Sequence, residues 1–267
     1  MQPFSLVLGG GSARGIAHIG VIQRLEELNA KPSHIVGTSI GAIVGAFYAF
    51  GFTSTEMRQV VRDTKFLTLI DPDVMHGGIK GRKVMTHFKK YFGEKTFADA
   101  IIPLTIVATN IDTGEKVVFQ EGRIIDALRA SISIPGVFVP FRYHGMSLVD
   151  GGIVANLPIE FATEDEKVIA VSVQMSVRKS VKKESKKLFF EKTPFIHTYI
   201  LLRKAVGIMI TQNESVSIAS RKNLLLIRPG RDDIDYYNFK KADALVEAGY
   251  EKSSEISQYL QASMNHG

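Results

Sequence analysis

Gly37-Thr38-Ser39-Ile40-Gly41 has the pattern G-x-S-x-G, in which a serine nucleophile lies on a tight turn between a strand and a helix. The neighbouring sequence fits that context, because Ser33–Val36 predicts a short strand and Ala42–Phe50 predicts an apolar helix. The two glycines suit a turn that holds its serine in an unusual backbone conformation. The pattern is short enough to occur by chance, so the rest of the chain has to decide whether Ser39 is reactive.

A second glycine-rich turn comes earlier, at Gly9-Gly10-Gly11-Ser12-Ala13-Arg14-Gly15, between a predicted strand at Phe4–Leu8 and a predicted helix at Ile16–Leu28. Its spacing does not match the dinucleotide-binding fingerprint, and Ile16-Ala17 stand where a phosphate-binding P-loop needs Lys-Ser/Thr. What remains is a loop of backbone N–H groups at a helix start, which suits an oxyanion. In a parallel sheet, both turns would lie at the same edge.

The remaining chain alternates strands with helices. Strands are predicted at Leu104–Ala108, Lys116–Phe119, Val168–Val173 and Leu224–Ile227, and helices at Thr55–Thr64, Val84–Phe92 and Ala242–Leu260. Such alternation predicts an α/β fold around a largely parallel sheet. No linker rich in Pro, Gly and Ser divides the chain, so we expect one domain over residues 1–267. Within it, residues 176–215 are expected to form a basic and amphipathic excursion or lid, and residues 240–267 a terminal helix and tail.

The composition is that of a globular protein, with 45% apolar and 22% charged residues among 267. The chain has no cysteine, which excludes disulfides, thiolate metal sites and a cysteine nucleophile. It shows neither a signal peptide nor an uninterrupted apolar stretch of membrane-spanning length. We therefore expect a cytoplasmic protein whose contact with membranes, if any, is peripheral.

The positive charge is partly concentrated. The net charge is +6, and Arg178–Lys187 carries six basic residues against one acidic residue, directly before Leu188-Phe189-Phe190. A solvated loop is the favoured interpretation, and contact with an anionic membrane surface is the alternative. No nucleic-acid motif accompanies the charge, so nucleic acid is not an expected partner. Phe195–Ile210 is expected to be core, a dimer face or a cap over an acyl channel, and the oligomeric state stays open.

A third element, Leu148-Val149-Asp150-Gly151-Gly152, places a carboxylate at the end of a predicted strand. Taken together and in this order, the three elements resemble the patatin-like phospholipase family. Arg129–Phe138 and Asn156-Leu157-Pro158 also resemble connecting segments of that family, and the resemblance covers roughly residues 4–175. It implies a three-layer α/β/α sandwich with a mostly parallel central sheet, and a serine hydrolase acting on acyl lipids.

The resemblance also implies roles for individual residues. Ser39 would be the nucleophile and Asp150 its general base, in a dyad that needs no histidine. The oxyanion hole would consist of backbone N–H groups of Gly10, Gly11 and Ser12, where Ser12 replaces a glycine of the family pattern. Supporting roles fall to Arg14, Gly37, Gly41, Gly151 and Gly152. The substrate would be a phospholipid or another acyl ester, with no metal or organic cofactor.

Three alternatives stay open beside this interpretation. An α/β-hydrolase triad would need His197 or His266, and it is disfavoured because Ser39 follows only one strand–helix unit. A lipid acyltransferase would share the first half-reaction, and a lipid-binding scaffold would keep the fold without turnover. His18 is expected to pack beside the first glycine turn. Three further residues could be mistaken for metal ligands and are expected to form an ordinary loop: Asp71, Asp73 and His76.

Overall fold

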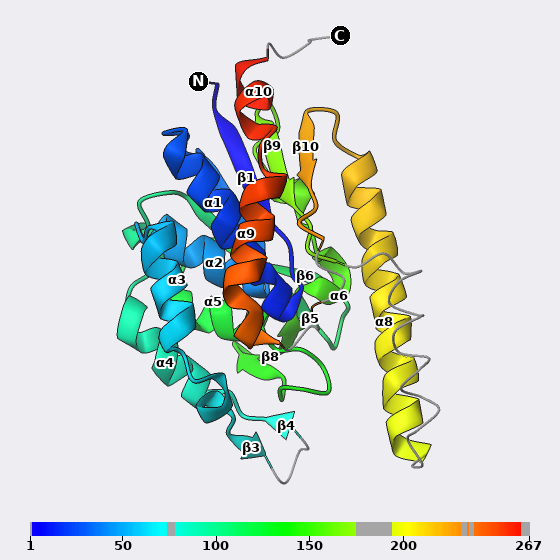
Figure 1. Cartoon of the computed structure of the whole chain (residues 1–267). Helices are drawn as coiled ribbons and strands as arrows, with labels where there is room; N and C mark the ends of the chain where they lie inside the picture. The colour runs from blue at the N-terminus through cyan, green and yellow to red at the C-terminus, as the bar shows by residue number, and fades with distance from the viewer. Residues whose placement is uncertain (1, 74–77, 175–193, 231–233, 235–237, 263–267) are drawn as a thin grey trace.

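The computed structural model describes residues 2–73, 78–174, 194–230, 234 and 238–262. In this part of the chain, an eight-stranded sheet lies between two layers of helices (Figure 1). Its order is β10-β9-β1-β2-β5-β8-β7, with β6 paired to β5. The strands are β1 (Phe4–Leu8), β2 (His34–Thr38), β5 (Leu104–Asn110), β6 (Lys116–Phe119), β7 (Phe141–Tyr143), β8 (Met146–Asp150), β9 (Lys167–Val171) and β10 (Leu224–Ile227).

Five of these strands are parallel, from β10 to β5, whereas β6, β8 and β7 join antiparallel. The predicted three-layer sandwich with a mostly parallel sheet is therefore confirmed. A short hairpin of β3 (Pro72–Asp73) and β4 (Gly78–Ile79) lies apart from this sheet.

The side chains of the central strands alternate between the two faces, as the period of a strand requires. Leu6 and Leu8 enter the larger core cluster, while Val7 between them enters the smaller one. The larger core is covered by α1 (Ala17–Glu27), α2 (Ile40–Ala49), α3 (Ser54–Asp63), α4 (Arg82–Phe92), α5 (Ile124–Ser131), α9 (Ala242–Lys252) and α10 (Ile256–Gln261). The other face carries the short α6 (Gly152–Ala155) and the long α8 (Pro194–Ala219), which stands along one side in Figure 1.

The helices α1 and α9 pack unusually closely, and two glycines permit it. A Cβ added at Gly20 would lie 1.9 Å from the carbonyl oxygen of Val246, and one at Gly249 would lie 1.9 Å from that of Ala17. Gly249 therefore has a packing role inside a helix where glycine is otherwise unfavourable. The predicted single helix over Ala242–Leu260 is divided, because α9 ends at Lys252 and α10 begins at Ile256.

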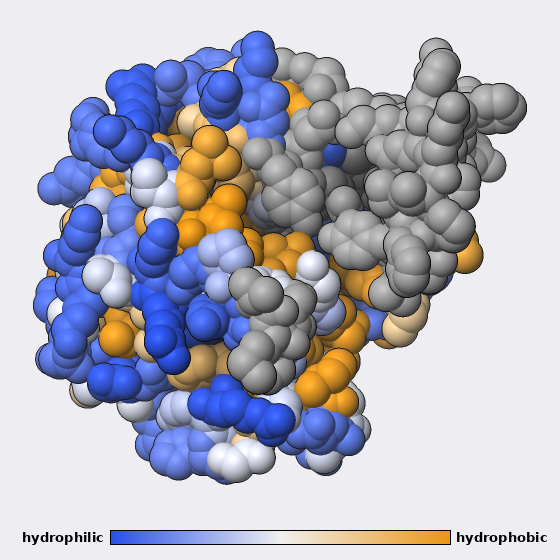
Figure 2. Space-filling model, turned by 90° about the horizontal axis from the view of Figure 1, so that it is seen from below, coloured by the Kyte–Doolittle hydropathy of each residue, from blue (hydrophilic) through white to orange (hydrophobic). Residues whose placement is uncertain are grey.

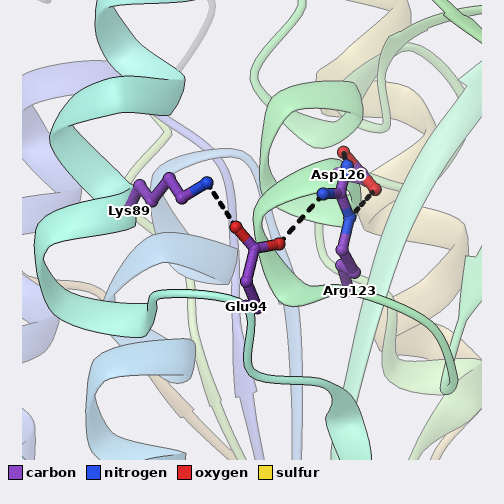
Figure 3. A network of polar contacts seen from close by, with 4 residues as sticks. All are labelled: Lys89, Glu94, Arg123 and Asp126. Carbon is purple, nitrogen blue, oxygen red and sulfur yellow. Dashed lines mark hydrogen bonds and ion pairs between the residues drawn. The ribbon is translucent and has the colours of Figure 1, made fainter.

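A surface network of charges joins the end of α4 to the start of α5 (Figure 3). Glu94 pairs with Lys89 and accepts a hydrogen bond of 3.1 Å from Arg123, which in turn binds both carboxylate oxygens of Asp126. Exposed pairs of this kind add little stability. The network connects α4 with α5, and both helices border the candidate active site.

Candidate active site

Ser39 lies on a strained turn between β2 and α2. Its φ is 56° and its ψ is −124°, a conformation that residues with a side chain rarely adopt, and only 5% of it is exposed. The flanking glycines leave the room that this turn needs. A Cβ at Gly41 would lie 2.0 Å from the carbonyl oxygen of Leu8, and one at Gly37 would lie 2.7 Å from the Cα of Ala42. The glycine spacing around Ser39 therefore has a steric cause.

Ser131 holds this turn in place, a role that the sequence did not predict. The backbone N–H of Ser39 donates to the hydroxyl of Ser131 over 2.8 Å, and that hydroxyl donates to the carbonyl of Val107 over 2.7 Å. Ser131 is fully buried at the end of α5. Because a strained backbone persists only when its surroundings fix it, we assign this anchoring role to Ser131.

The register of the sheet brings Asp150 to the level of Ser39. Thr38 of β2 is opposite Val107 of β5, and the next β5 residue, Ala108, is opposite Asp150 of β8. The two residues thus flank the same strand at the same height. The side chain of Ser39 lies close enough to the Asp150 carboxylate to lower the pKa of that group.

Burial changes the acidity of this carboxylate. Asp150 is 6% exposed, and burial raises its pKa from 3.8 to about 6. The neighbouring Ser39 side chain and a hydrogen bond of 2.7 Å from the N–H of Gly152 act in the opposite direction. A pKa near 6 makes this carboxylate a stronger base than an ordinary aspartate, and it is still mostly ionised at neutral pH.

The first glycine turn lies directly beside Ser39. A Cβ at Gly10 would lie 3.3 Å from the Cβ of Ser39. The N–H of Gly10, however, donates to the carbonyl of Asn156 over 3.0 Å. Among the described residues, the N–H groups of Gly11 and Ser12 have no hydrogen-bond partner, which leaves them available to a ligand. Ser12 has a φ of 53°, in the left-handed region that favours glycine.

Asn156 lies between the first glycine turn and the turn that follows Asp150. Its side-chain oxygen would lie 2.6 Å from a Cβ at Gly10 and 2.9 Å from one at Gly152. Its amide donates weakly, over 3.4 Å, to Glu214 of α8. Glu214 is 3% exposed, and burial raises its pKa against the opposing effects of Ser172, Arg228 and Asn156. Sequence reasoning singled out Asn156 only as part of a connecting segment and missed Glu214.

Arg14 and His18 brace the first turn from behind. The guanidinium of Arg14 is buried and donates two hydrogen bonds, of 3.0 and 2.9 Å, to the carbonyl of Ile234. His18 is fully buried, and its Nε2 lies 2.8 Å from the carbonyl oxygen of Gly9. Burial lowers the pKa of His18 to about 4, so the ring is neutral at physiological pH and donates from Nε2.

An apolar cavity of about 200 Å³ opens beside the serine turn. Ser12 and Ser39 line it together with residues from α2, α3, α4 and η2 (Phe66–Leu69). Its walls include Ile16, Phe47 and Phe88. A chamber of this character fits a hydrocarbon chain rather than a polar group.

The remaining candidates have other placements. Asp71 accepts hydrogen bonds from the backbone N–H groups of Gly81 and Arg82, both 2.8 Å, and so caps α4. No group of three or more potential metal ligands gathers in the described residues. His197 lies in α8, while His76, His266 and the basic run Arg178–Lys187 lie outside the described residues. In the described part of the chain, no helix has both the length and the apolar character of a membrane span.

Comparison with known sequences gives a consistent result. The family described as Patatin-like phospholipase matches residues 6–163. An uncharacterized NTE family protein of Mycobacterium tuberculosis is 39% identical over 158 residues, which cover 58% of this chain and 44% of that protein. Lysophospholipase NTE1 of Kluyveromyces lactis is 28% identical over 287 residues, covering 97% of this chain and 19% of that protein. The chain thus spans less than half the length of these relatives.

Among solved structures, VipD from Legionella pneumophila has a similar fold. The TM-score is 0.62 at 16% sequence identity, and the match covers 97% of this chain and 66% of that one. At this identity the likeness concerns the fold alone.

Proposed function

The chain belongs to the patatin-like phospholipase family, and we propose that it hydrolyses acyl esters of lipids through a Ser39–Asp150 dyad. One observation carries the proposal. Ser39 lies across β5 from a buried carboxylate, Asp150, whose pKa is raised to about 6, and it lines an apolar cavity of about 200 Å³. The phospholipase name of the family and the lysophospholipase name of one relative support lipid esters as the substrate class.

In the first half-reaction, Ser39 Oγ attacks the ester carbonyl carbon as Asp150 accepts the hydroxyl proton. The carbonyl oxygen becomes an oxyanion, and the N–H groups of Gly11 and Ser12 donate to it. Gly10 supports the loop through its bond to Asn156. The alcohol leaves with the proton from Asp150, and an acyl-serine remains. Removing one oxyanion donor typically costs about 3 kcal/mol of barrier, so the loop matters as much as the base.

In the second half-reaction, Asp150 takes a proton from water, and the resulting nucleophile attacks the acyl-serine. The tetrahedral intermediate collapses to a fatty acid, and the proton returns to Ser39. The acyl chain would occupy the apolar cavity throughout, lying along Ile16, Phe47 and Phe88. We also propose that residues 1–267 form one domain, which is supported by the continuous core from β1 to α10.

Active-site labelling tests the dyad directly. A fluorophosphonate probe should label the wild type at Ser39, should not label Ser39→Ala, and should label Asp150→Asn at least a hundredfold more slowly. Hydrolysis of a soluble short-chain ester should follow the same order. Labelling at another residue would contradict the mechanism, and wild type that neither labels nor hydrolyses any ester would favour a lipid-binding scaffold. Product analysis with an added alcohol separates hydrolysis from acyl transfer.

A further inference from the structure

One segment beside the cavity exposes apolar side chains to solvent. In η2, Phe66 and Leu69 line the cavity, whereas Leu67 between them is 83% exposed. Ile70, which follows directly, is 41% exposed. Single exposed apolar residues are common on protein surfaces and need no explanation. Here, however, the exposed pair continues an apolar wall that leads to Ser39.

An aromatic pair separates the cavity from this exposed segment. The rings of Phe66 and Phe239 stack with centroids 3.9 Å apart and planes 18° apart, and both rings line the cavity. Phe239 comes from η5 (Phe239–Lys241), far along the chain. The half-buried pair therefore lies where the cavity meets the surface of η2.

Four exposed lysines lie near the exposed pair or near the aromatic rings beside it. Lys83 Nζ donates to the carbonyl of Ile70 over 3.2 Å, which places its charge beside that residue. All members of this set are exposed and adjoin Leu67, Ile70 or the Phe66–Phe239 pair: Lys65, Lys83, Lys240 and Lys241.

Acidic residues also lie near this surface. Asp243 pairs with Arg62. Asp71 accepts from backbone N–H groups at the start of α4 and Asp63 accepts from a glutamine of α3, so these two keep their charge, and Asp73 in β3 adds a further acidic residue. Figure 2 views the molecule from the side where β3, β4 and α4 lie at the bottom of Figure 1. Apolar residues cross that face in a band bordered by hydrophilic residues.

We propose that this η2 surface, formed by Leu67, Ile70 and the four lysines, docks the protein on an anionic lipid bilayer. Exposed apolar side chains with lysines nearby match the surface of such a membrane, because lysines can meet the headgroup phosphates while leucine and isoleucine reach the boundary of the acyl chains. The inference rests on the proposed function, since it places the bilayer next to the cavity that receives the acyl chain. A lipid could then pass between membrane and Ser39 without crossing bulk water.

The α8 helix also exposes apolar residues, including Leu201 at 68% and Val216 at 71%. The structure favours η2 for two reasons. The η2 residues adjoin the cavity that contains Ser39, whereas none of the α8 side chains that the structure describes lines it, and Lys83 contacts the η2 end at Ile70. The test therefore includes both surfaces.

Vesicle binding tests the η2 surface independently of catalysis. Ser39→Ala protein comprising residues 1–267 would be sedimented with vesicles of phosphatidylcholine alone or with an equal part of phosphatidylglycerol. We expect binding to the anionic vesicles. Leu67→Asp should weaken it about tenfold or more, because it replaces a leucine that enters the membrane with a negative charge, the same sign as that of the lipids. The matched control is Ile101→Asp, at a residue 65% exposed before β5 at the opposite end of the sheet, and its binding should be unchanged.

Replacing Lys240 and Lys241 with Gln should weaken anionic binding about fivefold for each lysine and reduce its salt dependence. Several outcomes would overturn the proposal. These are absence of anionic binding by the parent protein, equal binding by Leu67→Asp and Ile101→Asp, or a loss confined to Leu201→Asp. In the Ser39-containing protein, Leu67→Asp should leave fluorophosphonate labelling and soluble-ester hydrolysis unchanged. Failure of the proposed function would appear in those two assays, and failure of the docking surface only in vesicle binding.

Discussion

Replacing Asp150 with Asn should make the protein more stable at neutral pH while abolishing most of its activity. Asn has nearly the same shape, and its side-chain oxygen can still accept the hydrogen bond from the N–H of Gly152. What it removes is a negative charge held at a position that is only 6% exposed. The gain in stability should therefore depend on pH.

The size of the effect follows from the pKa of the carboxyl group. Folding raises the pKa of Asp150 from 3.8 to about 6, so the folded state favours the neutral acid. The stability contributed by this group is fully present below about pH 4 and is lost as the pH rises through about 6. The change amounts to about 3 kcal/mol in the free energy of unfolding. Relative to wild type, Asp150→Asn should thus gain about 3 kcal/mol between about pH 4 and pH 8.

Urea denaturation of both proteins across this pH range measures the difference. Asp165→Asn, at an exposed carboxylate, controls for the change in net charge. A difference between Asp150→Asn and wild type that stays constant with pH, or that shrinks as pH rises, would refute the reasoning. In wild type, kcat/KM for a soluble ester should also fall below about pH 6, because the protonated acid cannot accept the proton of Ser39.

Three substitutions test the surrounding structure. Ser12→Gly should raise the free energy of unfolding by about 0.5–1 kcal/mol, because it relieves the strain of a φ of 53°. A free energy of unfolding below that of the wild type would show that the serine side chain stabilises the loop. Gly249→Ala should lower it by about 3 kcal/mol, since the new Cβ meets the carbonyl of Ala17. Its control is Gly207→Ala in α8, where no atom lies within 4 Å of the added carbon, and equal effects would contradict the packing argument. Ser131→Ala should slow fluorophosphonate labelling and cost about 1–3 kcal/mol, because the N–H of Ser39 loses its buried partner, and unchanged labelling would remove its anchoring role.

Local patterns were enough to predict the central strands and the two glycine turns. The predicted strand at Phe4–Leu8 matches β1, and the helix predicted at Val84–Phe92 corresponds to α4, which begins two residues earlier at Arg82. Continuous apolar runs predict central strands, because a strand that is covered by helices on both faces needs apolar side chains at successive positions. The same runs carry no information on strand direction, so the antiparallel joining of β8 to β5 was not predicted.

The contacts that complete the site depend on residues far apart in the sequence. Ser131 is 92 positions from Ser39, and Glu214 is 58 positions from Asn156. Neither residue type is distinctive, and only the folded arrangement gives them a role. The break between α9 and α10 was missed for a related reason. The hydroxyl and the N–H of Ser253 both donate to the carbonyl of Tyr250 and end α9 there. A serine alone is not a specific sequence signal for the end of a helix.

The position of β5 between Ser39 and Asp150 has a consequence for how freely the protein can diverge. The separation of the two residues is measured across strands, by the ladders that join β2, β5 and β8, and not along the chain between them. Insertions in the exposed turn at Asp112-Thr113-Gly114 leave both ladders untouched. A single-residue deletion inside β5 would instead shift one partner past the other. Exposed turns between serine and aspartate are thus free to change in length, provided that the seven residues of β5 keep their register.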